Sequence, residues 1–417
     1  MTNSCTRVRR VPPIKLELVK DLARHLRAGH PWVYRRALQK PPSGLQSGEI
    51  IDITDRGRFV ARGYYDALSH TAVRVLTRDP AEAIGLLYWR RKIARAVALR
   101  RAFVPFSEGD TDCCRLVHGE GDGLPGVIID LYAKFAVIKL YSAGLTPHRE
   151  QIVEALRGEV ALEGIWGRDE QGAAAAAEEG EEEDGDDGKP AGKLLWGKEP
   201  PELITVRENG ARLAVDVRGG QKTGMFLDQR ENRLALRRYA KGRRALNCFA
   251  FSGGFSVQAA LGGAREVTSV DRDAGALQLA KKNFELNELR QPHQLATADV
   301  NDFLAQKKAE GARYDLIILD PPAFAKTQKA VPAALDGYAS LHRAALQLLP
   351  TLGILATASC SARVSADEFV NAIKEAAVKV GAELQLLEER RQPPDHPVSI
   401  AFPEGRYLKF FVFRRVD

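Results

Sequence analysis

The sequence has no long apolar run and few cysteines. No stretch reaches the roughly 18 consecutive apolar residues of a membrane span, so we expect no transmembrane helix. The first residues, MTNSCTRVRRVPP, lack the apolar segment of a secretory signal. The five cysteines fit no metal-ligand spacing, and an odd number without a signal favours reduced thiols. These absences predict a cytoplasmic protein without a bound metal ion.

Acidic charge is concentrated in one segment. Residues 178–188 carry eight acidic side chains and no basic one, whereas the whole chain has a net charge of +7. Without these eight negative charges the rest of the chain would carry +15. Such a basic body favours a polyanionic partner, first of all nucleic acid, although a basic protein without such a partner is the alternative. The acidic run belongs to a low-complexity segment, about residues 170–193, which predicts a disordered loop. This loop is either a neutral insertion or a mimic of nucleic acid.

The length and the hydrophobic pattern predict several domains. After a tail of residues 1–13, β-rich runs over residues 14–80 predict a small barrel that either binds RNA or only packs. Residues 81–111 contain a basic amphipathic stretch typical of a linker helix. Residues 112–206 predict a central α/β domain. From residue 207 to 417 strands and helices alternate, which predicts a doubly wound, mostly parallel sheet and an α/β fold class.

Three strands of this last part are predicted to end in residues that suit an adenosyl ligand. In open α/β sheets, ligands bind at the carboxyl ends of the strands. The first of these strands ends in NCFAFSGGFS, where Gly253 and Gly254 let the backbone approach a ligand. The next two end at Asp271, which suits a ribose diol, and at Asp299, which suits an adenine amino group; each acid is equally well explained as a helix N-cap. The loop lacks the G-x-G-x-x-G pattern, so S-adenosylmethionine fits better than a nicotinamide dinucleotide.

The next two strand ends suit a planar base. In LDPPAF, Pro321 and Pro322 fix the backbone after a strand and aim Asp320 and Phe324 into a cleft. The aromatic ring can stack on a base while the acid pairs with its edge; the alternative is a rigid turn with a core phenylalanine. In TASCS, Cys360 stands where a strand gives way to a loop, either as a small buried hydrophobe or as a nucleophile.

These motifs together resemble one enzyme family. KTGMFLDQRENR, LNCFAFSGGFS, LDPPAFAK, TASCS and DHPVSIAFPEGRYLK resemble the RlmI-type methyltransferases of large-subunit ribosomal RNA. GHPWVY and GDGLPGVIIDLY extend the resemblance to nearly the whole chain. The resemblance implies an N-terminal PUA RNA-binding domain, a central α/β domain and a C-terminal, Rossmann-like class I methyltransferase domain. It also implies methyl transfer from S-adenosylmethionine to C5 of a cytosine in 23S rRNA.

The resemblance also implies residue roles. Cys360 is then the nucleophile that adds to C6 of the cytosine, and Asp320 is the group that pairs with or protonates the base. The strands that end at these two residues are expected to be neighbours, so that both side chains reach one ring. The implied cofactor contacts are Asn247, Phe249, Ser252, Gly253, Gly254, Phe255, Asp271, Asp299, Val300, Asp320 and Gln229. The implied substrate contacts are Pro321, Pro322, Phe324, Lys222 and Arg230.

Other interpretations remain open at this point. The chain could methylate another base position without a thiol, or act as a non-catalytic RNA-binding factor in ribosome assembly. It departs from the family pattern in its acidic segment and at Ala362, where the family often has glycine. The helix after Cys360 is expected to begin at Ser365, with Glu368 completing a capping box. RNA is the expected partner, and the oligomeric state is open, a homodimer being one option.

Overall fold

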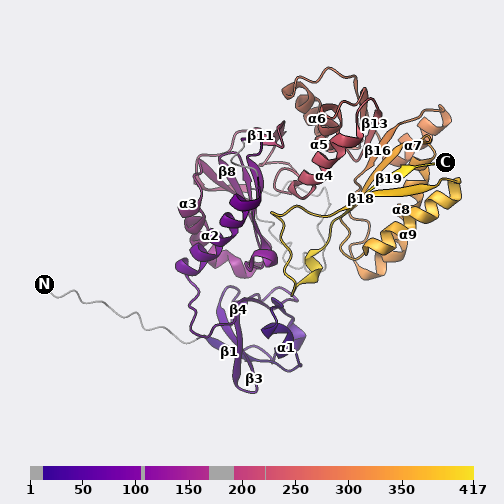
Figure 1. Ribbon diagram of the computed structural model, residues 1–417. Helices are drawn as coiled ribbons and strands as arrows, with labels where there is room; N and C mark the ends of the chain where they lie inside the picture. The colour runs from indigo at the N-terminus through magenta and orange to yellow at the C-terminus, as the bar shows by residue number, and fades with distance from the viewer. Residues whose placement is uncertain (1–12, 105–108, 169–191, 221) are drawn as a thin grey trace.

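The computed structural model describes residues 13–104, 109–168, 192–220 and 222–417 and shows three bodies joined along the chain (Figure 1). The N-terminal body, at the bottom of Figure 1, is one five-stranded sheet with the strand order β1-β3-β4-β5-β2. Its elements are β1 (Ile14–Glu17), α1 (Ala23–Arg27), β2 (Trp32–Val33), β3 (Ile50–Asp55), β4 (Arg58–Tyr65) and β5 (Val73–Thr77). Apolar side chains from these strands and α1 form a core of their own, as the predicted barrel requires.

The central body is a second five-stranded sheet with the order β10-β9-β8-β7-β6, covered by two helices (Figure 1). Its elements are α2 (Leu86–Phe103), β6 (Cys113–His118), β7 (Val127–Tyr132), β8 (Phe135–Leu140), α3 (Arg149–Glu159), β9 (Gly164–Arg168) and β10 (Gly192–Gly197). The predicted linker helix is α2, which begins only after the extended Gly85. Most of the predicted acidic loop lies outside the described residues. Its predicted end is wrong, because residues 192–193 pair with β9.

A hairpin leads from the central body into the C-terminal one. It consists of β11 (Ile204–Glu208) and β12 (Ala211–Val215). Val206 and Leu213 of the hairpin pack in the same hydrophobic cluster as Ala245 of the C-terminal sheet. Glu208 accepts two hydrogen bonds from the buried guanidinium of Arg233, which lies in the C-terminal body.

The C-terminal body has a seven-stranded sheet with the order β15-β14-β13-β16-β17-β19-β18. Strands β13 to β17 run parallel to one another, and β19 pairs antiparallel with both β17 and β18. The strands are β13 (Arg244–Cys248), β14 (Glu266–Asp271), β15 (His293–Thr297), β16 (Leu316–Leu319), β17 (Ile354–Ser359), β18 (Leu384–Arg390) and β19 (Lys409–Arg415). The chain order reverses between β13 and β16, which is where such sheets bind ligands.

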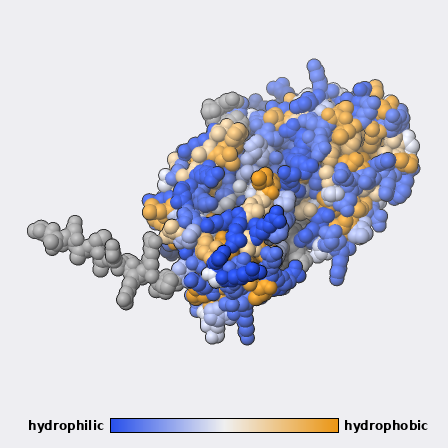
Figure 2. All heavy atoms as spheres, turned by 60° about the horizontal axis from the view of Figure 1, so that its bottom comes forward, coloured by the Kyte–Doolittle hydropathy of each residue, from blue (hydrophilic) through white to orange (hydrophobic). Residues whose placement is uncertain are grey.

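Helices cover both faces of this sheet, and the expected doubly wound α/β architecture is confirmed (Figure 1). They are α4 (Arg230–Leu236), α5 (Gly254–Leu261), α6 (Ala274–Leu286), α7 (Val300–Ala309), α8 (Val331–Leu346) and α9 (Ala366–Val380). Helix α9 has Ser365 as its N-cap, and Glu368 completes the predicted capping box. No described helix is long and apolar enough to cross a membrane. The face in Figure 2 is mostly hydrophilic, with scattered hydrophobic residues.

Residues 391–408, which we call the strap, leave the sheet between β18 and β19 and reach the other two bodies (Figure 1, yellow). The carboxylate of Asp395 accepts the backbone N–H of Arg115 in the central body. The ring of Phe402 lies 4.6 Å from that of Trp32 in the N-terminal body. The strap therefore connects all three bodies within one chain.

Candidate active site

The loop that follows β13 has a strained backbone. Phe249 (φ 59°), Phe251 (φ 47°) and Gly253 (φ 74°) all adopt the left-handed conformation, which is costly for the two phenylalanines. A Cβ atom on Gly253 would lie 2.7 Å from the Cβ of Ala280 in α6, so only glycine fits there. Hydrogen bonds such as that from the Ala250 N–H to the Val270 carbonyl hold the loop in place. Strained backbone of this kind concentrates at ligand sites.

Asp271 fixes this loop to the end of β14. Its Oδ2 accepts the Phe251 N–H at 2.8 Å and its Oδ1 accepts the Asp273 N–H at 3.0 Å. The residue is only half-buried, so the carboxylate also faces outward. Asp299 is an exposed N-cap of α7, whose Oδ1 accepts the Asn301 N–H at 2.8 Å. The cap explanation therefore holds for Asp299, while Asp271 is not a cap, since Asp273 caps α6.

Three of the predicted cofactor residues lie in the protein interior. Asn247 is 1% exposed, with its Nδ2 donating to Ser256 Oγ at 2.9 Å. Phe255 is 5% exposed and stacks on Phe410 with ring centroids 5.9 Å apart. Val300 is buried in a hydrophobic cluster that also contains residues of α8. The side chains of these residues support the strand ends, and their role as cofactor contacts stays a prediction.

The remaining residues fit an adenosyl ligand. Ser252 lies in the strained loop, where its carbonyl accepts a hydrogen bond from Asn283 at 2.8 Å, and Gly254 is the first residue of α5. The half-buried Asp271 and the exposed Asp299 stand at the ends of the neighbouring strands β14 and β15. Backbone groups and carboxylates of this kind hold a ribose and an adenine amino group without any diphosphate contact. S-adenosylmethionine has these groups.

Asp320 follows β16, on the other side of the point where the strand order reverses. Its Oδ1 accepts a hydrogen bond from Gln229 Nε2 at 2.9 Å, and Gln229 Oε1 accepts one from Asn232 at 2.6 Å. Burial and the negative charge of Asp228 raise the pKa of Asp320 to about 7. Gln229, predicted as a cofactor contact, thus orients the Asp320 carboxyl group, which exchanges its proton near neutral pH.

The segment before α4 borders Asp320. Asp228 accepts a hydrogen bond from the hydroxyl of Tyr407 at 2.7 Å. The ammonium of Lys222 lies 4.5 Å from the ring centre of Phe226, and its positive charge acts on both Asp228 and Asp320. Lys222 therefore lies close enough to Asp320 to act on its carboxyl group, and its role as a substrate contact stays a prediction.

Arg230 lies elsewhere. It is fully buried, and its guanidinium donates two hydrogen bonds to the Asp395 carboxylate at 2.7 and 3.1 Å. Arg230 therefore binds the strap and is not available to a substrate, which differs from the predicted role. A sequence pattern cannot show this pairing, because the two partners are 165 positions apart.

Cys360 and the loop after Asp320 are held together as one unit. Strands β16 and β17 are neighbours, as predicted, and Sγ of Cys360 lies 4.0 Å from the carbonyl oxygen of Pro321. Ser361 Oγ accepts the backbone N–H groups of Phe324 and Ala325 at 3.1 and 3.3 Å. We call these contacts of Ser361 the serine clamp. The clamp brings the thiol to the loop that carries Asp320, with the half-buried Pro322 between Pro321 and Phe324.

Phe324 is supported from one side. Its ring stacks on that of Tyr338 in α8, with centroids 4.6 Å apart and an angle of 30° between the planes. The Tyr338 hydroxyl lies 2.9 Å from both Ser359 Oγ and Ser361 Oγ. Phe324 is half-buried, so part of its ring remains accessible. The sequence analysis missed Tyr338, since a tyrosine within an amphipathic helix gives no distinguishing signal.

The other described cysteines are unsuitable as nucleophiles. Cys113, Cys114 and Cys248 are fully buried, and burial raises the pKa of each thiol. Cys5 lies outside the described residues. Among the four described cysteines only Cys360 is partly exposed. The described residues also contain no group of three or more His, Cys, Asp or Glu side chains that could hold a metal ion.

Comparisons with known proteins agree with this geometry. A family profile described as S-adenosylmethionine-dependent methyltransferase matches residues 175–414, and one described as a PUA-like domain matches residues 16–78. A protein from Escherichia coli O139:H28 called "Ribosomal RNA large subunit methyltransferase I" is 38% identical over 403 residues, which cover 96% of this chain and 99% of that protein. Its namesake from Klebsiella pneumoniae strain 342 is 39% identical over 402 residues, covering 96% and 98%.

Solved structures give the same result. A methyltransferase from Streptococcus mutans is 26% identical and superposes with a TM-score of 0.80 over 96% of this chain and all of that one. Another methyltransferase, in complex with SAH, is also 26% identical, with a TM-score of 0.82 and the same coverage. The predicted family, fold class and cofactor are thereby confirmed. The chain belongs to the S-adenosylmethionine-dependent methyltransferase family, alongside the proteins called ribosomal RNA large subunit methyltransferase I.

Proposed function

We propose that this protein transfers a methyl group from S-adenosylmethionine to C5 of a cytosine in large-subunit ribosomal RNA. The names of the relatives support the RNA substrate, and the PUA-like domain supports RNA binding. The observation that carries the cytosine chemistry is the position of Cys360, which alone among the described cysteines is partly exposed. Sγ of Cys360 lies 4.0 Å from the carbonyl oxygen of Pro321, the residue that directly follows Asp320, whose pKa is about 7.

The thiol makes an otherwise unreactive carbon nucleophilic. The thiolate of Cys360 adds to C6 of the cytosine, so that an S–C6 bond forms and the C5–C6 double bond is lost. The electron density moves toward C5 and N3, and the proton on Asp320 is donated toward N3. S-adenosylmethionine, when bound, supplies the methyl group that C5 takes up. A base then removes the C5 proton, the C5–C6 double bond re-forms as the S–C6 bond breaks, the thiolate leaves, and N3 returns its proton to Asp320.

The substrate base is held by the loop after β16. We assign the accessible part of the Phe324 ring to stacking on the cytosine, with Pro321 and Pro322 shaping the wall beside it. We also assign Lys222, whose charge acts on Asp320, to contact with an RNA phosphate. Asp271, Asp299 and the strained loop after β13 are assigned to the cofactor.

Replacing Cys360 tests the proposal directly. The wild-type protein, ribosomal RNA and labelled S-adenosylmethionine should yield 5-methylcytosine, and Cys360→Ala should reduce the yield to background. Cys248→Ala is the matched control, because it removes a thiol buried inside β13 and should leave turnover close to wild type. Undiminished turnover in Cys360→Ala would refute the thiol mechanism and indicate methylation at another base position.

A trapped adduct gives a second readout. RNA that contains 5-fluorocytidine has no C5 proton to lose after methyl transfer, so the S–C6 bond should persist. The wild-type protein should then form a protein–RNA complex that survives denaturing electrophoresis. Cys360→Ala should form none. Absence of the complex with the wild-type protein, under conditions where it methylates unmodified RNA, would contradict the covalent step.

A further inference from the structure

Lys409 is a buried cation beside the turn that carries Cys360. It is the first residue of β19 and pairs with Ser359, the last residue of β17, one position before the cysteine. Its side chain is almost completely enclosed, with 3% of the residue exposed. The surrounding strand sequence, LKFFVF, is otherwise apolar. An isolated lysine in a buried strand is costly unless its charge has a partner.

The ammonium group of Lys409 is fully engaged by carbonyl oxygens. Nζ donates to Ser361 at 2.6 Å, to Val364 at 2.9 Å and to Tyr407 at 2.8 Å. Two of these acceptors lie in the turn that follows Cys360, and the third lies in the strap. All three are neutral, and Lys409 forms no ion pair with a carboxylate among the described residues. The hydrogen bonds therefore fix the position of the charge without neutralising it.

Among the charged groups that act on Lys409, Cys360 has the largest effect on its pKa. Burial lowers the pKa of Lys409 to about 8, a negative charge on Cys360 or Glu368 raises it, and Arg391 lowers it. Of these two groups Cys360 has the larger effect, and the Glu368 carboxylate is held at the start of α9 by the N–H and the hydroxyl of Ser365 at 2.7 Å each. At neutral pH Lys409 is thus a protonated, desolvated cation close to a thiol.

We infer that Lys409 is a positioning residue that holds the turn after Cys360 and stabilises the Cys360 thiolate with its positive charge. The thiol proton passes to solvent, and the resulting anion is balanced by the buried ammonium. Nearby cations lower the pKa of reactive cysteines in this way. Helix α9 is a weaker source of stabilisation, because it begins at Ala366, six positions after the cysteine. This inference rests on the proposed role of Cys360 as the nucleophile.

Alkylation of Cys360 without RNA tests the inference. The rate of carbamidomethylation by iodoacetamide is measured against pH, with Cys360 resolved by peptide mass spectrometry. In the wild-type protein the midpoint should lie below the value of about 8.5 for a free thiol. Lys409→Gln, which keeps a hydrogen-bond donor without the charge, and Lys409→Met should both react about tenfold more slowly at neutral pH. Lys409→Arg, which keeps the charge, should react faster than either.

Several outcomes would overturn the inference. One is a wild-type midpoint at or above that of a free thiol, which needs no variant and is unaffected by misfolding. Another is an alkylation midpoint of Lys409→Gln that equals that of the wild-type protein, provided that calorimetry shows the variant still binds S-adenosylmethionine. Failure of the proposed function is seen separately, since Cys360→Ala would then keep its turnover whatever the alkylation profile shows.

Discussion

Asp320 illustrates how its surroundings give an ordinary carboxyl group an unusual property. Burial and the charge of Asp228 raise its pKa from 3.8 to about 7, although Arg233, Gln229 and Lys222 act in the opposite direction. A carboxyl group with this pKa is partly protonated at neutral pH. It can therefore donate a proton to a ring nitrogen where an ordinary aspartate could not.

Asp320→Asn should lower turnover by about 10²-fold or more, because the amide cannot transfer a proton. The wild-type rate should fall as the pH rises through about 7, since the protonated form of Asp320 is lost there. The variant should lack this fall. The measurement is the pH profile of kcat with ribosomal RNA as substrate. A fall above pH 7 that survives in the variant would assign it to another group.

The same variant has an independent effect on stability. The pKa of Asp320 is higher in the folded protein than in the unfolded chain, so its stabilising contribution is complete below about pH 4 and is lost as the pH rises to about 7. Asp320→Asn does not titrate. Its Tm relative to wild type should therefore increase between about pH 4 and pH 8. A constant Tm difference over this range would show that the pKa is not raised.

At the scale of the elements, the serine clamp joins the ends of β16 and β17. Ser361→Ala would leave the buried N–H of Ala325 and the N–H of Phe324 without an acceptor, which should cost about 1–3 kcal/mol. Turnover should fall as well, because the loop with Asp320 loosens relative to Cys360. Urea unfolding and kcat measure the two effects. Ser340→Ala, at an exposed position of α8, should change stability by less than about 0.5 kcal/mol.

Prediction from the sequence succeeded for elements whose signal is local. The order of strands and helices after residue 207 follows from hydrophobic periodicity, and the Ser365–Glu368 capping box follows from spacing alone. It failed where a residue's role depends on a distant partner. Nothing near Arg230 shows that Asp395 will neutralise it. Lys409 did carry a signal, a single cation within an apolar strand, but its role depends on the turn after Cys360.

At the scale of the whole molecule, the strap fixes the three bodies to one another. Asp395 is buried; burial alone would raise its pKa, but His396 and Arg230 outweigh burial and hold the pKa well below its ordinary value. Its backbone carbonyl also accepts a hydrogen bond from Arg100 in α2 at 2.6 Å. The strap then continues to Tyr407 and Lys409 at the active site. Asp395 thus joins the central body to Arg230 of the C-terminal body, and the same strap leads on to the turn after Cys360.

Asp395→Asn should destabilise the protein by about 1–3 kcal/mol, because it removes the charge of the buried partner of Arg230 and leaves the guanidinium only the half-buried Glu231. Chemical denaturation at neutral pH measures this. Asp417→Asn is the control, since it removes an exposed partner of Arg415 and should cost no more than about 1 kcal/mol. Equal effects of the two substitutions would show that the strap contributes no more than a surface ion pair.

The basic charge of the molecule should make RNA binding dependent on salt. The affinity of the full chain for ribosomal RNA should fall steeply as salt rises, because each contacted phosphate releases a counterion.

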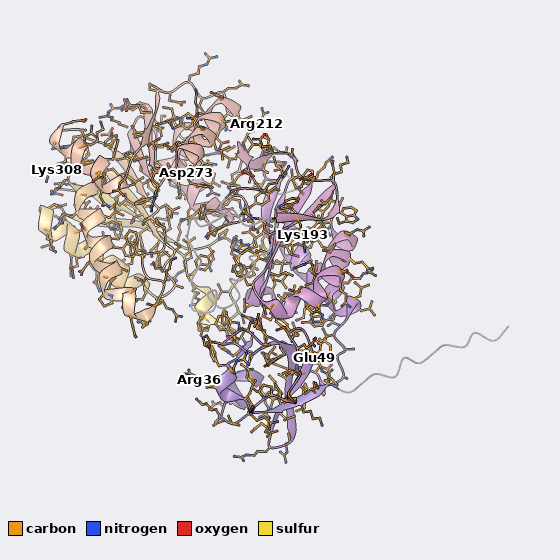
Figure 3. The ribbon with its side chains drawn as sticks, turned by 180° about the vertical axis from the view of Figure 1, so that it is seen from behind. Arg36, Glu49, Lys193, Arg212, Asp273 and Lys308 are labelled. Atoms are coloured by element: carbon orange, nitrogen blue, oxygen red, sulfur yellow. The ribbon has the colours of Figure 1, made fainter. Side chains whose placement is uncertain are left out.

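Arg36 is exposed on the N-terminal body, and Lys308 is exposed on α7 of the C-terminal body, far from it (Figure 3). Arg36→Ala should weaken binding and reduce the slope of log K against log salt by about 1, whereas Lys308→Ala should leave both unchanged. Filter binding over a range of salt concentrations measures the slopes. A flat response in the wild-type protein would contradict the interpretation of the charge, and equal slopes for Arg36→Ala and wild type would exclude Arg36 from the RNA interface.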